Sequence, residues 1–172
     1  MEPRSLLRSL PDLVRPLLPS DLREFRSGAR WVIVQVYYGN RDLHYEAWHR
    51  AKLRTIEIGL HFEADPLTNA RLLGAFRRRE RAIRRALGEA ARVEEWDRGW
   101  ARIWEPVPYQ SLDAALQARL AARLARYITV LEPILREELP ADVAWRPAIR
   151  RTRSSGSPRR ARAARGAAAP RG

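Results

Sequence analysis

The stretch "TIEIGLHFEAD", residues 55–65, decides the fold because its side chains alternate between two chemical types. Every second position is apolar, at Ile56, Ile58, Leu60 and Phe62. The positions between them include two acids and one imidazole, at Glu57, His61 and Glu63. A period of two residues is typical of a β-strand that packs one face on the core. We therefore expect the apolar row to face helices and the polar row to face water.

Two further strand patterns precede this stretch. The segment "RWVIVQVYY", from Arg30, is rich in β-branched and aromatic residues, and the turn cluster "GNRD" separates it from "LHYEAWHRA". Together the three segments predict an antiparallel meander. Its first strand should point three valines inward, at Val32, Val34 and Val36. The alternate positions then point outward, at Trp31, Ile33 and Tyr37.

At Asp65 the apolar period changes from 2 to 3.6 residues. Asp65 can cap a helix whose first residue is Pro66, and the pattern predicts one long helix over 66–88 that ends at Gly88. Its apolar stripe consists of Leu72, Phe76, Ile83 and Leu87. The segment that follows, residues 92–109, predicts a β-hairpin around "DRG". Pro106 and Pro108 should confine its second strand to an edge or end it.

The remaining segments complete an α+β architecture. Leucines at helical spacing over 111–139 predict a second long helix, kinked by Pro133. Residues 1–29 predict a short N-terminal helical arm, and residues 140–172 a disordered Arg-rich tail. The domain over 30–139 is therefore a five-stranded, mostly antiparallel sheet in the order β-β-β-α-β-β-α. Each helix has one apolar stripe, so both should cover the same face.

The strand "TIEIGLHFE", the short strands "VEEW" and "ARIW" and the closing helix with "VLEPIL" resemble a known family. It is a bacterial domain of unknown function often appended to restriction-type nuclease modules. The resemblance covers residues 31–139. It implies an accessory role near DNA-processing systems and supplies no catalytic residues. A nuclease centre is not expected, because "EIG" at 57–59 lacks a lysine two positions after the glutamate.

Composition excludes several classes of site. With no cysteine among 172 residues, disulfides, thiolate nucleophiles and cysteine-ligated zinc are ruled out. The longest apolar run, "WVIVQVYY", is too short to span a membrane, so we expect a soluble cytoplasmic protein without a membrane partner. The net charge is +13, and eight arginines without an acid follow from Arg150 onward. Lys52 is the single lysine, so GC-rich base composition is a competing explanation for the arginines.

Two arginine groups are candidates for contact with a nucleic acid or another polyanion. Arg77, Arg81, Arg84 and Arg85 share one side of the 66–88 helix, with Arg78 beside them. The predicted nucleic-acid-binding residues are Arg77, Arg78, Arg81, Arg85, Arg150, Arg151, Arg153, Arg159, Arg160, Arg162 and Arg165. The competing interpretations are a solvated helix face and a weakly constrained extension.

All three histidines, His44, His49 and His61, fall in the predicted meander. A register in which paired residue numbers sum to 107 places Arg50 opposite Glu57, Trp48 opposite Gly59, Glu46 opposite His61 and His44 opposite Glu63. A divalent metal could then bind His44, Glu46, His61 and Glu63. The simpler interpretation is a set of cross-strand pairs on a solvent-facing sheet. We favour that interpretation, and assign no catalytic residue, metal or cofactor.

Six tryptophans allow a similar choice. Trp100, Arg102 and Trp104 alternate onto one face that could stack bases or a partner, whereas core packing explains the same residues.

The leading prediction is a noncatalytic binding or accessory module for a protein or nucleic acid, with sequence-independent attraction through the basic tail. The alternatives are a small metal-dependent enzyme using the His/Glu group, and a homodimer joined through the outer sheet face.

Overall fold

The computed structural model describes residues 1–145 and shows an α+β fold built on one antiparallel sheet. The strands are β1 (Arg26–Arg30), β2 (Ile33–Tyr37), β3 (Leu43–Arg50), β4 (Thr55–Phe62), β5 (Arg92–Glu95) and β6 (Ala101–Pro108). The helices are α1 (Pro3–Arg8), α2 (Leu10–Val14), α3 (Pro66–Arg78), α4 (Glu80–Leu87) and α5 (Ala114–Glu138). Short 3-10 turns are η1 (Arg15–Leu17), η2 (Ser20–Leu22), η3 (Ala51–Leu53) and η4 (Asp97–Gly99).

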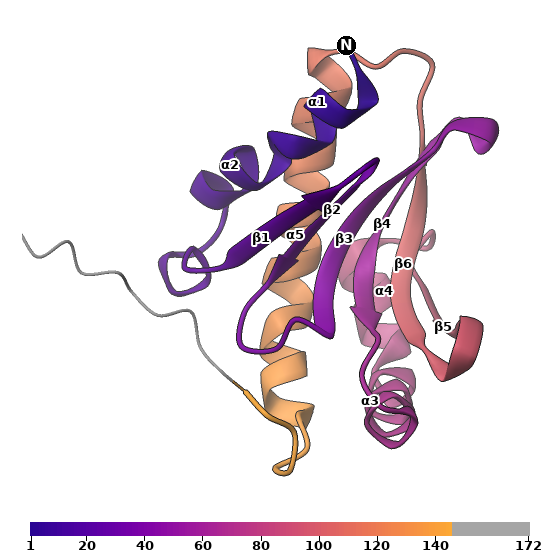
Figure 1. The fold of residues 1–172 in the computed structure, drawn as a ribbon. Coiled ribbons are helices and arrows are strands. Elements are labelled where there is room, and N and C mark those ends of the chain that lie inside the picture. The colour runs from indigo at the N-terminus through magenta and orange to yellow at the C-terminus, as the bar shows by residue number, and fades with distance from the viewer. Residues whose placement is uncertain (146–172) are drawn as a thin grey trace, which may run out of the picture.

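The sheet order is β1-β2-β3-β4-β6-β5, and the long helices cover one face of it. In Figure 1, α5 runs behind the sheet, so the viewer looks onto the opposite face, which we call the outer face. The apolar row of β4 lies in the core, and Ile58 is fully buried. Phe62 meets Phe76 of α3 edge to face, with ring centres 5.2 Å apart. The predicted placement of both helix segments on one side of the sheet is confirmed.

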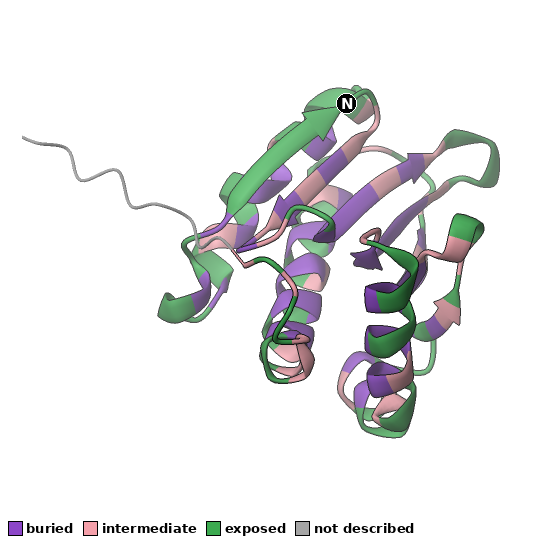
Figure 2. Ribbon diagram, turned by 60° about the horizontal axis from the view of Figure 1, so that its bottom comes forward, coloured by how far each residue is buried: buried purple, intermediate pink, exposed green. Residues whose placement is uncertain are grey.

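The sheet has six strands rather than the five predicted, because β1 lies in the segment expected to belong to the helical arm. All five of its residues are exposed, and Figure 2 shows this strand green along its length. β1 pairs with β2 through a turn at Trp31, whose φ is 52°. The sequence of β1, "RSGAR", has no apolar alternation because neither of its faces packs on the core.

Two other elements differ from expectation in detail. The predicted 66–88 helix is divided at Arg79, whose guanidinium bonds to Glu137 and Glu138 at the end of α5. The predicted cap at its start is confirmed, since the Asp65 carboxylate accepts hydrogen bonds from the backbone N–H groups of Leu67 and Thr68.

β6 lies between β4 and β5, but β5 reaches only as far as Trp104. Pro106 and Pro108 of β6 therefore have a strand beside them on one side only, that of β4. The open side tolerates their missing N–H groups.

The predicted register between β3 and β4 is wrong by two residues. Paired residue numbers sum to 105, which places His44 opposite His61, Glu46 opposite Gly59 and Trp48 opposite Glu57. The turn is tighter than expected because Arg54 adopts a left-handed conformation with φ 50°, so Arg50 pairs with Thr55. An even shift keeps every side chain on its predicted face.

Within residues 1–145, no helix combines the length and apolar character needed to cross a bilayer. The tail arginines from Arg150 onward lie outside the described residues.

Candidate functional site on the outer sheet face

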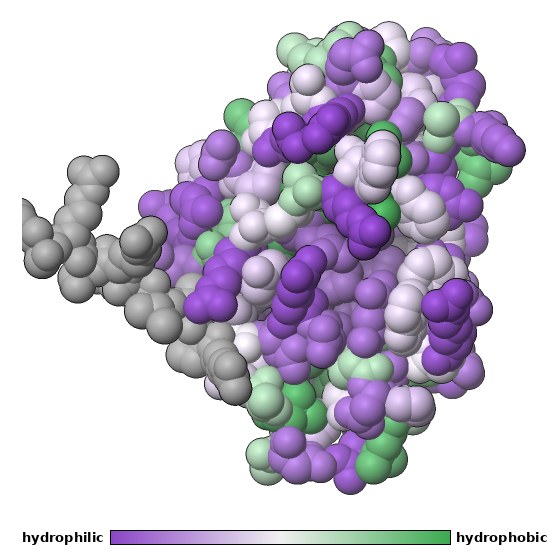
Figure 3. All heavy atoms as spheres, in the orientation of Figure 1, coloured by the Kyte–Doolittle hydropathy of each residue, from purple (hydrophilic) through white to green (hydrophobic). Residues whose placement is uncertain are grey.

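The polar row of the outer face is buried, which corrects the expectation that it faces water. His44 is 2% exposed and His61 3%, and the carboxyl-bearing residues Glu46 and Glu57 are also buried. Figure 3 views this face and shows it largely covered by hydrophilic side chains. A buried polar group costs free energy unless it is paired, so the partners of these groups decide what they do.

The turn between β5 and β6 covers His61. The Trp96 ring stands perpendicular to the His61 ring, at 88° and 5.5 Å between ring centres. Arg102 anchors this cover, because its guanidinium lies 4.7 Å from the Trp96 ring centre and 3.8 Å from that of Trp104. The same guanidinium bonds to Glu57 and Glu94. An ion pair and stacked aromatic rings thus exclude water from His61.

Beneath this cover, His44, His61 and Glu63 converge to form what we call the His–Glu cluster. One nitrogen from each imidazole and one Glu63 carboxylate oxygen all lie within 4.8 Å of one another. The two imidazole rings stack at 13° with centres 5.6 Å apart. Opposed positions on β3 and β4 produce this stacking, and Glu63 follows immediately after β4.

The protonation of His44 follows from its neighbours. Its Nδ1 lies 2.9 Å from the Arg41 carbonyl oxygen, which can only accept, so Nδ1 carries the hydrogen. Nε2 therefore presents a lone pair, which the Gln35 amide meets at 2.9 Å while also donating to Glu46 at 3.0 Å. A backbone carbonyl that fixes the tautomer in this way is the usual support of a metal-binding histidine.

Glu46 lies beside the cluster, with its Oε2 3.4 Å from His44 Nε2. Burial raises the pKa of Glu46, whereas its contact with His44, the nearby His61 imidazole and the Gln35 amide lower it. The net direction is downward, so Glu46 is ionised at neutral pH. An ionised carboxylate here favours positive charge near His44.

The contacts within the cluster are too long for hydrogen bonds, and one of them matches the spacing of ligand atoms around a shared ion. Glu63 Oε1 lies 3.6 Å from His61 Nδ1 and 4.0 Å from His44 Nε2. Hydrogen bonds between nitrogen and oxygen span about 2.7–3.2 Å. Ligand atoms held about 2.0–2.2 Å from one tetrahedral ion lie roughly 3.3–3.6 Å apart. Among residues 1–145, His61 Nδ1 is buried with no hydrogen-bond partner.

A cavity of about 470 Å³ opens beside the cluster, and we call it the outer-face cavity. Its volume is in the range of small-ligand sites. Three tryptophans line it, Trp48, Trp96 and Trp100. Its polar and charged lining consists of Arg30, Gln35, Arg41, Asp42, His44, Glu46 and Glu63. The small residues Gly28 and Ala29 of β1 border it on the side of the sheet edge.

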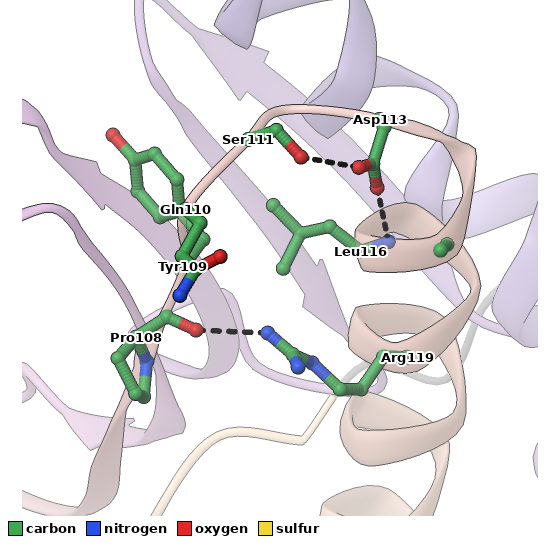
Figure 4. A pocket seen from close by; sticks show the side chains of 8 residues that line it. Pro108, Tyr109, Gln110, Ser111, Asp113, Leu116 and Arg119 are labelled. Carbon is green, nitrogen blue, oxygen red and sulfur yellow. Dashed lines mark hydrogen bonds between the residues drawn. The ribbon is translucent and has the colours of Figure 1, made fainter.

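A second hollow of about 580 Å³ lies where β6 leads into α5, and the side chains of Ser111, Asp113 and Arg119 in its lining are paired. Figure 4 shows Ser111 bonded to Asp113, Asp113 capping α5 at Leu116, and Arg119 donating to the Pro108 carbonyl. The Tyr109 hydroxyl lies 2.5 Å from His49 Nε2. Its titratable side chains are thus already engaged within residues 1–145, unlike His61 Nδ1 of the His–Glu cluster.

Of the four residues that the alternative interpretation offered as metal ligands, the structure brings His44, His61 and Glu63 together and places Glu46 beside them. The third histidine, His49, is separate, because it faces the helices and pairs with Tyr109. Sequence reasoning missed Gln35, the Arg41 carbonyl and the covering role of Trp96. Gln35 could have been found as the one polar side chain within the apolar strand "IVQVY".

Of the two interpretations of Trp100, Arg102 and Trp104, an exposed stacking face is not what the structure shows for Trp104. Trp104 is buried at 8% exposure and its ring is covered by Arg102. The Cβ atom and backbone of Trp104 also pack directly over Gly59 of β4. Trp104 is therefore buried on the outer face rather than in the hydrophobic core, while Trp100 lines the outer-face cavity.

The predicted helix arginines Arg77, Arg78, Arg81 and Arg85 are all exposed. Arg78 approaches Glu138 at 3.8 Å, whereas Arg77, Arg81 and Arg85 form no ion pair within residues 1–145. Arg84 differs from them, since it pairs with Glu89 at 2.9 Å. The break at Arg79 places Arg77 and Arg78 on α3 and the other two on α4.

Comparisons with known proteins return no matching family model, curated protein or solved structure. The resemblance to a nuclease-associated domain therefore stays a prediction.

Proposed function

We propose that the protein binds a divalent transition-metal ion through His44 Nε2, His61 Nδ1 and the Glu63 carboxylate. The observation that carries this proposal is the buried, unpartnered His61 Nδ1 beside a carboxylate oxygen 3.6 Å away. Two imidazoles and one carboxylate suit zinc or iron(II), and leave further coordination positions open. His44 and Glu63 line the outer-face cavity, so an exogenous ligand can approach the ion from there.

Binding requires local changes in the side chains. The Gln35 amide must release His44 Nε2, and it keeps its second hydrogen bond, to Glu46. The cluster must also contract from nitrogen to oxygen distances of 3.6 and 4.0 Å. At least one imidazole must turn, because the in-plane lone pairs of two rings stacked at 13° do not converge on one ion. The strand pairing that holds His44 opposite His61 need not move.

Calorimetric titration of chelator-treated protein with zinc tests the proposal. We expect one ion per chain and a raised melting temperature, because an ion that binds the folded state alone stabilises it. His61→Phe keeps a ring against His44 and Trp96 but removes both nitrogens, so it should abolish binding. His49→Phe is the matched control, since His49 pairs with Tyr109 away from the cluster. Wild-type protein that takes up no zinc, or His61→Phe that binds it equally well, would refute the proposal.

A second function, attraction of polyanions, is supported by a different observation. Arg77, Arg81 and Arg85 are exposed and have no acidic partner within residues 1–145. Unpaired guanidinium groups can contact phosphates without reading sequence. We propose that these arginines act together with the arginines from Arg150 onward, and that nucleic acid is the polyanion. Salt-dependent binding to mixed-sequence DNA tests this.

A further inference from the structure

The charges around the outer-face cavity change sign when a metal ion binds. Two arginines and three carboxylates line it, so apart from the histidine the lining has one net negative charge. A divalent ion in the His–Glu cluster gives it one net positive charge. The inference developed here rests on that proposed metal site. Once the ion is present, the cavity attracts an anion, and the open coordination positions are its natural point of attachment.

The tryptophans that line the cavity already have cations of their own. Each stacks with an arginine of this chain, so a cationic ligand would have to compete with that arginine for the face of the ring. The distances from guanidinium carbon to ring centre are 4.1, 4.7 and 6.0 Å for the pairs Arg50–Trp48, Arg102–Trp96 and Arg98–Trp100. Rings held in this way present flat apolar walls with positive charge nearby. Such walls favour a planar ring that bears a negative group.

We propose that the metal-loaded outer-face cavity binds a small flat-ring anion. Its acid group completes the coordination of the ion held by His44, His61 and Glu63. Its ring packs against Trp48 and Trp100, on the side bordered by the small residues of β1. The cavity of about 470 Å³ accommodates a single ring with one acid group.

Three probes separate the parts of this ligand. Phenylphosphonate has the ring and the acid group, methylphosphonate lacks the ring, and benzyl alcohol lacks the acid. Each is titrated calorimetrically into the full-length protein, both zinc-loaded and zinc-free. Trp100→Ala removes a cavity wall outside the His–Glu cluster. Trp31→Ala is its control, because Trp31 is 78% exposed and does not line the cavity.

We expect phenylphosphonate to bind the zinc-loaded protein roughly tenfold more tightly than methylphosphonate, and the zinc-free protein far more weakly. Trp100→Ala should weaken phenylphosphonate binding roughly fivefold and leave zinc binding unchanged, whereas Trp31→Ala should change neither. If zinc binds but phenylphosphonate gains nothing over methylphosphonate, the ligand proposal fails and the metal site stands. If zinc itself does not bind, both fail.

Discussion

A buried nitrogen without a hydrogen bond costs free energy, and His61 has one beneath Trp96. The cost of such a group is about 1–3 kcal/mol. Replacing it with an apolar group of similar shape removes this cost. We therefore expect the histidine to destabilise the metal-free fold and a bound ion to offset that cost.

His61→Phe should accordingly leave the metal-free protein as stable as wild type, or more stable. Urea unfolding in the presence of a chelator measures this, with His49→Phe as the comparison, because His49 is paired with Tyr109. We expect His49→Phe to lose about 1 kcal/mol and His61→Phe to lose nothing. A loss of more than about 1 kcal/mol in His61→Phe would assign this histidine a structural role.

Gly59 is required for a close approach between strands. A Cβ atom there would lie 2.5 Å from the Ile103 carbonyl oxygen and 2.7 Å from Trp104 Cβ. Gly59→Ala should therefore lower the free energy of unfolding by about 1–3 kcal/mol. Gly28→Ala is the control, because a Cβ at Gly28 meets nothing within 4 Å and should change stability by less than about 0.5 kcal/mol. Equal stability of the two variants would contradict the packing of Trp104 over Gly59.

At the scale of elements, the sequence predicted the type of each element and the face of each side chain better than it predicted which residues pair between strands. Alternation in β4 placed His61 and Glu63 on the face of His44 whatever the register, because any even shift preserves faces. The partner of each residue depended on the left-handed conformation of Arg54, which no periodicity reveals. β1 was missed because an edge strand without a buried face has no alternation. Burial of the polar row was missed because it depends on Arg102 holding Trp96 over it.

The contact between α5 and β3 includes a buried acid, Glu132, which accepts from the Tyr45 hydroxyl at 3.0 Å and from Arg136 at 2.9 Å. Burial raises the pKa of Glu132 above its usual value of 4.5, against the opposing effect of Arg136. The folded state therefore holds this proton more tightly than the unfolded state. Its contribution to stability is complete below about pH 4.5 and is lost as the pH rises through the folded pKa.

Glu132→Gln removes this titration. Relative to the variant, wild-type stability should fall as the pH rises above 4.5, and the difference should then level off. Urea unfolding of both proteins from pH 4 to 8 measures it. Glu137→Gln, on the exposed side of the same helix, controls for loss of a carboxylate. The account would be contradicted if wild type became more stable relative to Glu132→Gln as the pH rose, because the pKa of Glu132 would then be lowered by folding rather than raised.

For the whole molecule, charge and aromatic residues are separated in a way that the composition alone did not show. The exposed arginines Arg77, Arg81 and Arg85 belong to α3 and α4, which Figure 1 shows below and behind the sheet. The residues that line the tryptophan-lined cavity lie on the outer face and at its border. Exposed Trp31 lies at the β1–β2 turn, and the prediction of a dimer through the outer face would use it. Such a dimer would cover the cavity. The molar mass in solution, measured by light scattering with and without zinc, therefore tests the dimer and the accessibility of the cavity together.

The polyanion proposal predicts that DNA binding follows the arginines rather than the cavity. A chain ending at Trp145 keeps the indole that packs against Gly39 but lacks the arginines from Arg150 onward. Measured by fluorescence anisotropy with mixed-sequence DNA, it should bind more weakly than the full chain and with a shallower dependence on salt. Replacing Arg77, Arg81 and Arg85 with Gln in the shortened chain should weaken binding again. Unchanged affinity after both changes would contradict the proposal.

The central claim concerns one ion at one place, and a crystal of the zinc-loaded protein tests it most directly. Anomalous diffraction at the zinc absorption edge locates the ion without reference to any assumed ligand. The account predicts one peak, about 2.0–2.2 Å from His44 Nε2, His61 Nδ1 and a Glu63 carboxylate oxygen. A peak elsewhere on the chain, or His61 Nδ1 bound to protein while zinc is present, would contradict it.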